Sequence, residues 1–347
     1  VSQVVAGAYL TSGTLGTANT GVQAALPTQI MLTPGNVVRR HSQYNETGYA
    51  DFVRADANRF GNLRPLLPAD GRTLQLLYGA PADGAPALKF AGSARFDGAP
   101  GGYGGSLMID GSTIGGSPNI EVTPSGATPT AGFVSLDANA LNAIGAPRMS
   151  IGGGTQLFDG SQRMLGGKAA SVTLRSGAEL KAREVLLIAQ AGGVIVEDGA
   201  RISTLGQGAD TPYPSTDGYT FTTKSNLLAV SNGQLNVTQT AVAGASKGIS
   251  IGQAELYGEG SLLFSTQGSG QLKLSDSARY GAKSLTLSMS SINIGEQTTL
   301  DSAASVLPNG LRLNQALLTL SMPSCRGIAM PMLRSMPART SLLRGGR

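Results

Sequence analysis

Four nine-residue segments, VTLRSGAEL (172–180), VIVEDGARI (194–202), LKLSDSARY (272–280) and INIGEQTTL (292–300), share one pattern. Each alternates apolar and polar residues, turns through small or polar residues, and returns to an inward-facing position. The offset is 22 residues in the first pair and 20 in the second. Such a period is typical of repeat architectures, in which stacked neighbours bury a core that no unit can bury alone.

A second apolar strand precedes these units, as in VLLIA (185–189), LLFST (262–266) and SLTLS (284–288). Two further stretches have a related form, LLAVSNGQLNV (227–237) and ISIGQAELYGEG (249–260). Gly177 and Gly199 fall at the same place in their units, where a tight bend favours a positive φ. We therefore predict an all-β fold, a right-handed parallel β-helix (solenoid) of about five coils stacked about 4.8 Å apart.

The 22-residue offset also predicts which residues stack. Aliphatic positions fall on aliphatic positions and charges on opposite charges: Val172 with Val194, Leu174 with Val196, Arg175 with Glu197, and Glu179 with Arg201. Because exposed ion pairs contribute little, we expect Val196→Asp to abolish cooperative unfolding and Glu197→Ala to have almost no effect.

Three regions of the chain differ in composition and in hydrophobic pattern. Residues 1–60 are mixed and polar, and we predict an irregular, partly ordered segment with a short helix around residues 50–59. Residues 61–320 form the predicted β-helix domain, interrupted by an inserted loop at 205–226. Residues 321–347 are basic and lack both strand and helix periodicity, so we predict a disordered tail.

Within the repeat domain, strand and turn signals occur at 74–80, 87–98 and 106–114, and residues 117–131 have the composition of a loop. Asp137 is suited to cap a short helix that Gly145 ends, ahead of a strand at 148–151. We expect this helix to cover the end or side of the strand stack.

Composition excludes several classes of protein. Charged residues are only 14% of the chain, and Gly accounts for 49 of 347 residues, which favours short strands and tight turns. No acidic residue follows Asp301, so the net charge of +5 belongs to the tail. Without a basic stripe carrying stacking aromatics, we expect no nucleic-acid partner.

Export is compatible with the cysteine content. Cys325 is the only cysteine and lies in the tail, so the repeat body has neither a disulfide framework nor a cysteine metal cluster. The longest apolar run, VLLIAQAGGVIV (185–196), is too short to cross a bilayer; it predicts two strands joined by a turn and no stable membrane insertion. The chain begins without Met or a signal peptide, which indicates a piece of a longer protein.

No catalytic motif is recognisable, and we predict no catalytic, cofactor-binding or metal-binding residue. Asp198, Asp276 and Glu296 share one position in their units. The alternative reading is a carbohydrate-active or carbohydrate-binding β-helix protein of the polysaccharide lyase or glycosidase type, in which such carboxylates converge. Its groove could be rimmed by the inserted loop, which carries Asp210, Tyr213, Asp217 and Tyr219. Solvated turn positions explain the same carboxylates, and we favour that interpretation.

A histidine-based triad is the remaining enzymatic possibility. His41 is the only histidine, and it lies near Ser42 and Asp51 in the sequence. Nothing in the pattern positions the three side chains, so a solvated loop histidine is favoured.

Three runs, GFVSLDANALNAIGAPRMSIGGG (132–154), VTLRSGAELKAREVLLIAQAGGVIVEDGARIST (172–204) and SLTLSMSSINIGEQTTLDSA (284–303), resemble filamentous haemagglutinin-like adhesins. These are large bacterial exoproteins of the two-partner secretion type. The resemblance covers about residues 60–320 and corresponds to the C-terminal side of these proteins. No functional residue of the family maps onto this segment.

The resemblance implies a non-catalytic β-helical shaft, without cofactors, that serves adhesion or biofilm formation. It implies export through an outer-membrane β-barrel secretion partner, which acts on an N-terminal domain missing from this sequence. The expected location is secreted or at the cell surface of a Gram-negative bacterium. A host-cell or glycan receptor is the other expected partner.

Overall fold

The computed structural model describes residues 2–3, 7–41, 47–60, 67–79, 88–111, 116–158, 162–208, 219–239, 243–275, 277–289, 292–294, 311–313 and 332–335. The chain divides into two compact units, Val1–Val53 and Arg54–Arg347. Each unit is described by itself, and every structural statement below refers to these residues.

The first unit contains a small antiparallel sheet. Its strands are β1 (Ser2–Gln3), β2 (Tyr9–Gly13) and β3 (Thr28–Leu32), followed by α1 (Gly35–His41). Within the segment expected to be irregular and partly ordered, backbone hydrogen bonds therefore form a hairpin of β2 and β3, although its sequence lacks alternating apolar residues. The helix expected around residues 50–59 is confirmed as α2 (Tyr49–Phe60).

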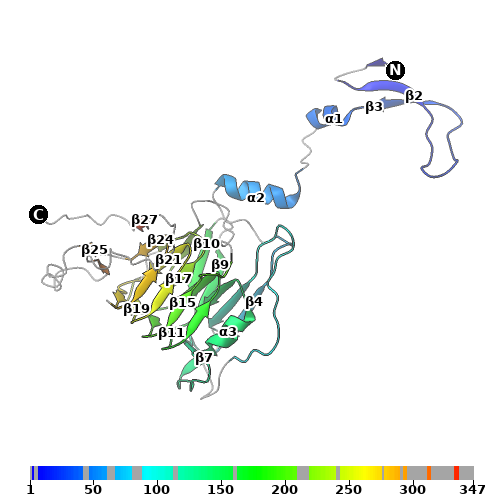
Figure 1. The fold of residues 1–347 in the computed structure, drawn as a ribbon. Helices are drawn as coiled ribbons and strands as arrows, with labels where there is room; N and C mark the ends of the chain where they lie inside the picture. Colours follow the sequence, from blue (N-terminus) through cyan, green and yellow to red (C-terminus); the bar gives the residue numbers. More distant parts are fainter. Residues whose placement is uncertain are drawn as a thin grey trace, which may run out of the picture. The chain divides into compact units, whose positions relative to one another are not determined.

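The second unit is built mostly of β-strands, which lie side by side in Figure 1. Sheet 1 contains, in spatial order, β27 (Met332–Ser335), β24 (Ser284–Ser288), β21 (Ser261–Ser265), β17 (Asn226–Ser231), β13 (Glu184–Ala189), β8 (Arg148–Ile151), β5 (Ser106–Gly111) and β4 (Thr73–Tyr78). Sheet 2 contains β22 (Leu272–Leu274), β19 (Ile249–Ile251), β14 (Gly193–Val196), β11 (Ser171–Leu174), β6 (Asn119–Thr123) and β7 (Phe133–Asp137), all parallel. The predicted all-β class is confirmed.

Two further sheets have four strands each. Sheet 3 contains β12 (Glu179–Lys181), β15 (Arg201–Ser203), β20 (Glu255–Tyr257) and β23 (Arg279–Gly281), all parallel. Sheet 4 contains β18 (Leu235–Gln239), β16 (Tyr219–Thr223), β10 (Gln162–Gly167) and β9 (Gly153–Phe158). A separate pair joins β25 (Ile292–Ile294) to β26 (Leu311–Leu313).

Successive strands pass from sheet 2 to sheet 3 to sheet 1, as β11, β12 and β13 do, and later β19, β20 and β21. The predicted register is confirmed, since Val172 pairs with Val194 and Leu174 with Val196. The same rows continue through Ile249 and Leu272. The 22-residue offset read from the sequence therefore describes the pairing of β11 with β14 and of β12 with β15, whereas Ile249 follows Val194 by 55 residues.

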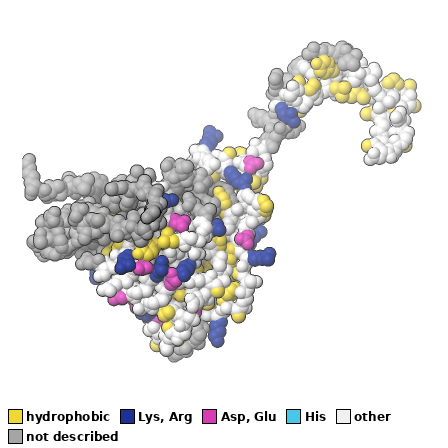
Figure 2. All heavy atoms as spheres, in the orientation of Figure 1, with side chains coloured by type: hydrophobic (Ala, Val, Ile, Leu, Met, Phe, Trp, Pro, Cys, Tyr) yellow, Lys and Arg dark blue, Asp and Glu magenta, His cyan; other side chains and the backbone are white. Residues whose placement is uncertain are grey.

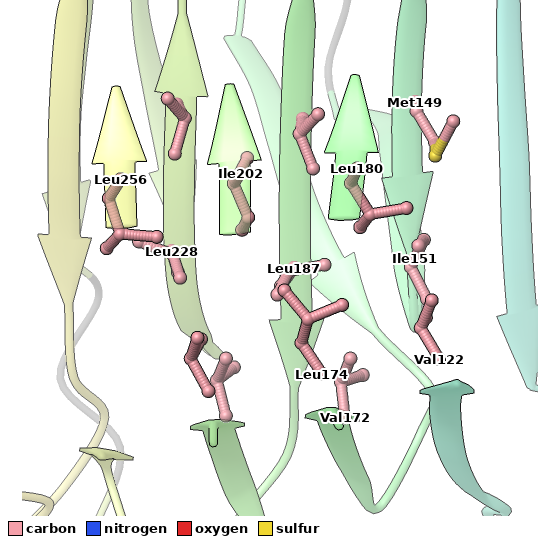
Figure 3. Packing of buried hydrophobic residues seen from close by; sticks show 14 of the residues in the cluster. Val122, Met149, Ile151, Val172, Leu174, Leu180, Leu187, Ile202, Leu228 and Leu256 are labelled. Carbon is pink, nitrogen blue, oxygen red and sulfur yellow. The ribbon is translucent and has the colours of Figure 1, made fainter. Parts of the chain in front are cut away.

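The core is formed by rows of aliphatic side chains from aligned strands. Leu180, Ile202 and Leu256 lie in one such row, and each is fully buried (Figure 3). They belong to one apolar cluster with Leu174, Leu187 and the other inward positions. Burial of each such side chain contributes about 1.5–3 kcal/mol, so the rows account for most of the stability.

Sheet 4 buries the outer face of sheet 1. A second apolar cluster contains Leu186 and Ile188 of β13 together with Leu235 and Val237 of β18. Strand β13 is consequently buried on both faces, which explains its uninterrupted apolar sequence. The prediction of two strands within 185–196 is confirmed by β13 and β14.

Strand β17 runs antiparallel to both β13 and β21, whereas the other neighbours within sheet 1 are parallel. The segment predicted as an inserted loop at 205–226 explains this reversal. It includes β16 at residues 219–223, which joins sheet 4 and returns the chain to sheet 1 from the opposite direction. The loop prediction was therefore wrong for β16.

Other local predictions failed for identifiable reasons. Residues 117–131 were expected to be a loop but contain β6. The strand was missed because the charged Glu121 stands between Ile120 and Val122, although all three residues are buried. The described residues 88–98 form no strand; Phe96 is buried, and its carbonyl accepts from Gly105 N. Of the tail expected to be disordered, residues 332–335 form β27, which pairs with the otherwise open edge of β24, and the prediction for the other tail residues lies outside the described residues.

The capped helix is confirmed as α3 (Ala138–Ile144). Asp137 accepts a hydrogen bond from Ala140 N, and Gly145 ends the helix at a φ of 71°. The helix lies against β12, the edge strand of sheet 3, as expected for an end cap. Its Asn142 amide donates to Glu179 O at 2.8 Å and accepts from Lys181 N at 2.9 Å, so it occupies the place of a neighbouring strand.

Candidate functional site

The aligned carboxylates were the first candidate for chemistry. Asp198 is exposed on the turn after β14, and its Oδ1 accepts a hydrogen bond from Gln253 N at 2.7 Å. In the next layer Gly252 lies against Asp198, and no carboxylate stands at Gly252 or Gln253. Asp198 thus joins two turns. Asp276, Glu296, Asp210 and Asp217 lie outside the described residues.

A second charged group is centred on Glu121 of β6, whose side chain is completely buried. Its carboxylate accepts hydrogen bonds from Ser135, from Thr130 N at 2.7 Å, and from Arg175 Nε at 2.7 Å. These contacts attach the loop between β6 and β7 to the outer face of sheet 2.

Arg175 extends this group to the next layer. It donates to Glu197 Oε1 at 2.7 Å, which confirms the predicted Arg175–Glu197 pair, and its guanidinium lies 4.9 Å from the Phe133 ring centre. Glu197 also accepts from Ser176 N at 3.0 Å. Every member therefore has charged or polar partners within the chain.

Electrostatics keep this group ionised. Burial by itself would raise the pKa of Glu121, but the hydrogen bonds from Ser135, Thr130 and Arg175 outweigh burial and lower it. Burial lowers the pKa of Arg175, and its bonds to Glu197 and Glu121 more than offset that effect. The Glu121 side chain has no exposed surface and its contacts are with residues of this chain, so we infer that its role is to hold the loop between β6 and β7.

Asp110 of β5 is the other buried carboxylate with a shifted pKa. Burial raises the pKa, opposed by the backbone N–H of Gly111 and by Lys168, whose Nζ lies 3.7 Å from Oδ2. Such a shift can mark a catalytic acid. The interactions of Asp110 are with a lysine and backbone groups, which is the pattern of a partly neutralised structural carboxylate.

A column of alternating charge crosses the outer face of sheet 3. Glu179, Arg201, Glu255 and Arg279 occupy the same register position on β12, β15, β20 and β23. Neighbouring members are 3.5–3.6 Å apart, so the predicted Glu179–Arg201 pair is confirmed. In Figure 2, Lys/Arg and Asp/Glu side chains alternate in a row across the face shown.

The remaining sequence candidates do not form a described site. His41 is the last residue of α1, Asp51 lies in α2, and Ser42 is outside the described residues. Among the described residues, no group of three or more His, Cys, Asp or Glu side chains is arranged to hold a metal ion. None of the described helices is long and apolar enough to cross a membrane.

Two features were missed in the sequence although a signal was present. The alternation in NIEVT (119–123) indicates a strand that would carry Glu121 on its outer face. Alignment of ISIGQAELY (249–257) with the units on either side places Glu255 between Arg201 and Arg279. The contact of Asp110 with Lys168 has no sequence signal, because 57 residues separate them.

The described residues thus define a β-rich protein with stacked parallel sheets, whose buried charges serve its structure. Comparison with protein-family models, with curated proteins and with solved structures gives no match.

Proposed function

We propose that this chain is a shaft segment of a large secreted bacterial surface adhesin of the filamentous haemagglutinin type, folded as a right-handed parallel β-helix and acting without catalysis. The shaft holds adhesive regions away from the cell surface. The observation that carries the proposal is the register of the aliphatic rows, which continue across sheets 1, 2 and 3 through successive layers.

Two arguments support the β-helix. The chain visits sheets 2, 3 and 1 in a fixed order, and strands one layer apart pair in parallel in sheets 2 and 3. Parallel strands joined by a crossover are right-handed in about 98% of cases, because of the inherent twist of the strands. A helix cap at one end agrees with the need of stacked repeats for a terminal cover.

The resemblance to two-partner secretion exoproteins supplies the rest of the proposal. We assign the protein to the cell surface of a Gram-negative bacterium or to its secreted fraction. Its partners are an outer-membrane β-barrel that exports it, through the family's N-terminal domain, and a host-cell or glycan receptor.

Deletion of one complete layer tests the fold. Removing residues 249–271 places β22 directly after the β14 layer, because the offset from Ile249 to Leu272 is one repeat. We expect both the full chain and the shortened chain to unfold cooperatively when followed by circular dichroism. Removing only residues 249–260, half a layer, is the control and should abolish cooperative unfolding. Equal loss in both deletions would contradict a stack of equivalent layers.

A glycan-array screen with and without calcium, followed by a turnover assay on any bound glycan, tests the function. A non-catalytic shaft leaves every bound glycan intact. The matched variant carries Asp198→Asn, Asp276→Asn and Glu296→Gln. Calcium-dependent glycan cleavage that this variant loses would replace the proposal with the carbohydrate-active alternative.

A further inference from the structure

The four side chains of the charge column on sheet 3 are partly exposed and can contact another molecule. The side chains of Glu179, Arg201, Glu255 and Arg279 are 33, 42, 35 and 74% exposed. Their mutual contacts of 3.5–3.6 Å are loose for ion pairs, while Glu179 Oε2 also lies 2.8 Å from Lys181 Nζ on the same strand. Sheet 3 therefore presents four partly exposed charges, one on each strand, in addition to their contacts within the chain.

The order of the charges makes this face complementary to itself. Read along the stack, the column is negative, positive, negative, positive. A two-fold axis parallel to the strands, passing between Arg201 and Glu255, reverses the column of a second copy. Glu179 then faces Arg279 of that copy and Arg201 faces Glu255, so all four contacts join opposite charges. A two-fold axis along the column would set each charge against itself and is excluded.

Apolar surface lies beside the centre of this face. Thr204 N donates to Tyr257 O at 2.9 Å, which places the following residue, Leu205, next to β20. Leu205 is 36% exposed, and Arg201 lies 5.8 Å from the Tyr257 ring centre. The axis that matches the charges preserves the strand direction, so it brings Leu205 of both copies to the same end of the strands, on the same side of the column. Hydrophobic contact at this position adds to the charge pairing.

We propose that the outer face of sheet 3 is a self-association surface, on which two copies of this chain pair through their charge columns with stack axes antiparallel. The proposal uses only the geometry of sheet 3 and does not depend on the proposed function. The interface is isologous, because the same patch serves both copies. Since its charges are exposed, the association is weak and depends on salt.

Sedimentation velocity of the full chain across a concentration series, at low and high NaCl, measures this association. We expect a reversible monomer–dimer equilibrium at low salt that weakens about tenfold or more at 0.5 M NaCl, because screening acts strongly on exposed charges. A chain that stays monomeric at every concentration at low salt overturns the proposal.

Charge reversal identifies the face. Arg201→Glu and Glu255→Arg each place like charges opposite one another in the antiparallel pair, and each should weaken dimerisation about tenfold or more. The double variant R201E/E255R restores opposite charges between copies, although it removes the alternation within one chain. We expect it to dimerise within about threefold of the wild type, since every intermolecular contact is again between opposite charges.

Lys273→Glu is the matched control, because Lys273 is exposed on β22 of sheet 2 and the charge change is the same. It should dimerise like the wild type. Thermal melts show whether each variant is folded. A 1:1 mixture of the Arg201→Glu and Glu255→Arg variants is a second test of the charge pairing. That mixture should form heterodimers. Failure of both the mixture and the double variant to associate, or equal weakening by Lys273→Glu, overturns the proposal.

Discussion

At the scale of single residues, the face of the strand decides what a side chain contributes. Val196 points inward and is 1% exposed, whereas the adjacent Glu197 points outward and bonds to Arg175 and Ser176. Inward positions are apolar and tolerate no charge, because a buried ion without a partner is costly. Outward positions carry charge that neighbouring layers partly neutralise.

Val196→Asp is therefore expected to lower the free energy of unfolding by more than about 3 kcal/mol and to abolish cooperative melting. Glu197→Ala should cost about 1 kcal/mol, more than the sequence alone indicated, because Arg175 and Ser176 each lose a hydrogen bond. Urea denaturation followed by circular dichroism measures both values. Equal effects of the two substitutions would contradict the inward and outward assignment.

Glu121 predicts a specific dependence of stability on pH. Its pKa is lowered in the folded chain, so its ionised form stabilises the fold above the ordinary value of about 4.3. That contribution is lost as the pH falls from there through the lower folded pKa. Glu121→Gln should lower stability at pH 7 because Arg175 loses its buried partner, and the difference from the wild type should shrink in acid. Thermal melts between pH 7 and pH 3 test this, and a difference that stays constant with pH would assign no role to the charge.

At the scale of elements, α3 covers the edge of β12, which would otherwise be exposed. The edge of β12 would leave backbone groups open to pairing with other chains. Asn142 bonds to both Glu179 O and Lys181 N, while Ala138, Leu141 and Ile144 bury the apolar side of the helix. A helix with one amide side chain thus ends sheet 3 where a strand would otherwise continue it.

Asn142→Ala should lower the free energy of unfolding by about 1–3 kcal/mol, because two backbone groups lose their partners. Faster amide hydrogen exchange at Lys181 is the direct readout. Asn139→Ala, on the exposed side of the same helix, serves as the control and should leave that rate unchanged. Asn142→Asp keeps the acceptor for Lys181 N, so rapid exchange in that variant as well would argue against the edge-capping role.

At the scale of the whole molecule, the main apolar cluster of the second unit extends across many layers, yet each strand pairs only with its neighbours in the sheet. Sheet 4 adds a second cluster on the outer face of sheet 1, which covers the consecutive strands β13, β17 and β21. Local stability should consequently vary along the stack, with the least protected strands at its ends.

Leu287→Ala, in β24 near one end of the stack, tests this arrangement. Leu287 is 4% exposed, and its truncation should cost about 2–4 kcal/mol. Hydrogen exchange should accelerate in β21 and β24 but remain nearly unchanged in β5 and β6, because those strands do not contact the altered layer. A uniform increase through the second unit would show instead that it unfolds as one block.

The repeat pattern alone determined how neighbouring layers of this protein align. The apolar spacing of 172–180 and 194–202 sets the register of β11 with β14 and of β12 with β15, because aliphatic rows exclude water only when aligned. Asp137 and Gly145 determine the ends of α3, since capping is a local interaction. Among the charges, both predicted pairs across the layers follow from the same offset.

Only the tertiary structure decided the features that depend on distant segments. The reversal of β17, the covering of sheet 1 by sheet 4, and the burial of Glu121 arise because chain far away in sequence supplies the partner. A strand is recognised in sequence by its own alternation, whereas its direction within the sheet is set by the route of the chain that leads to it. The stretch 172–300 therefore predicts the layers through its period, and the folded chain decides what covers them.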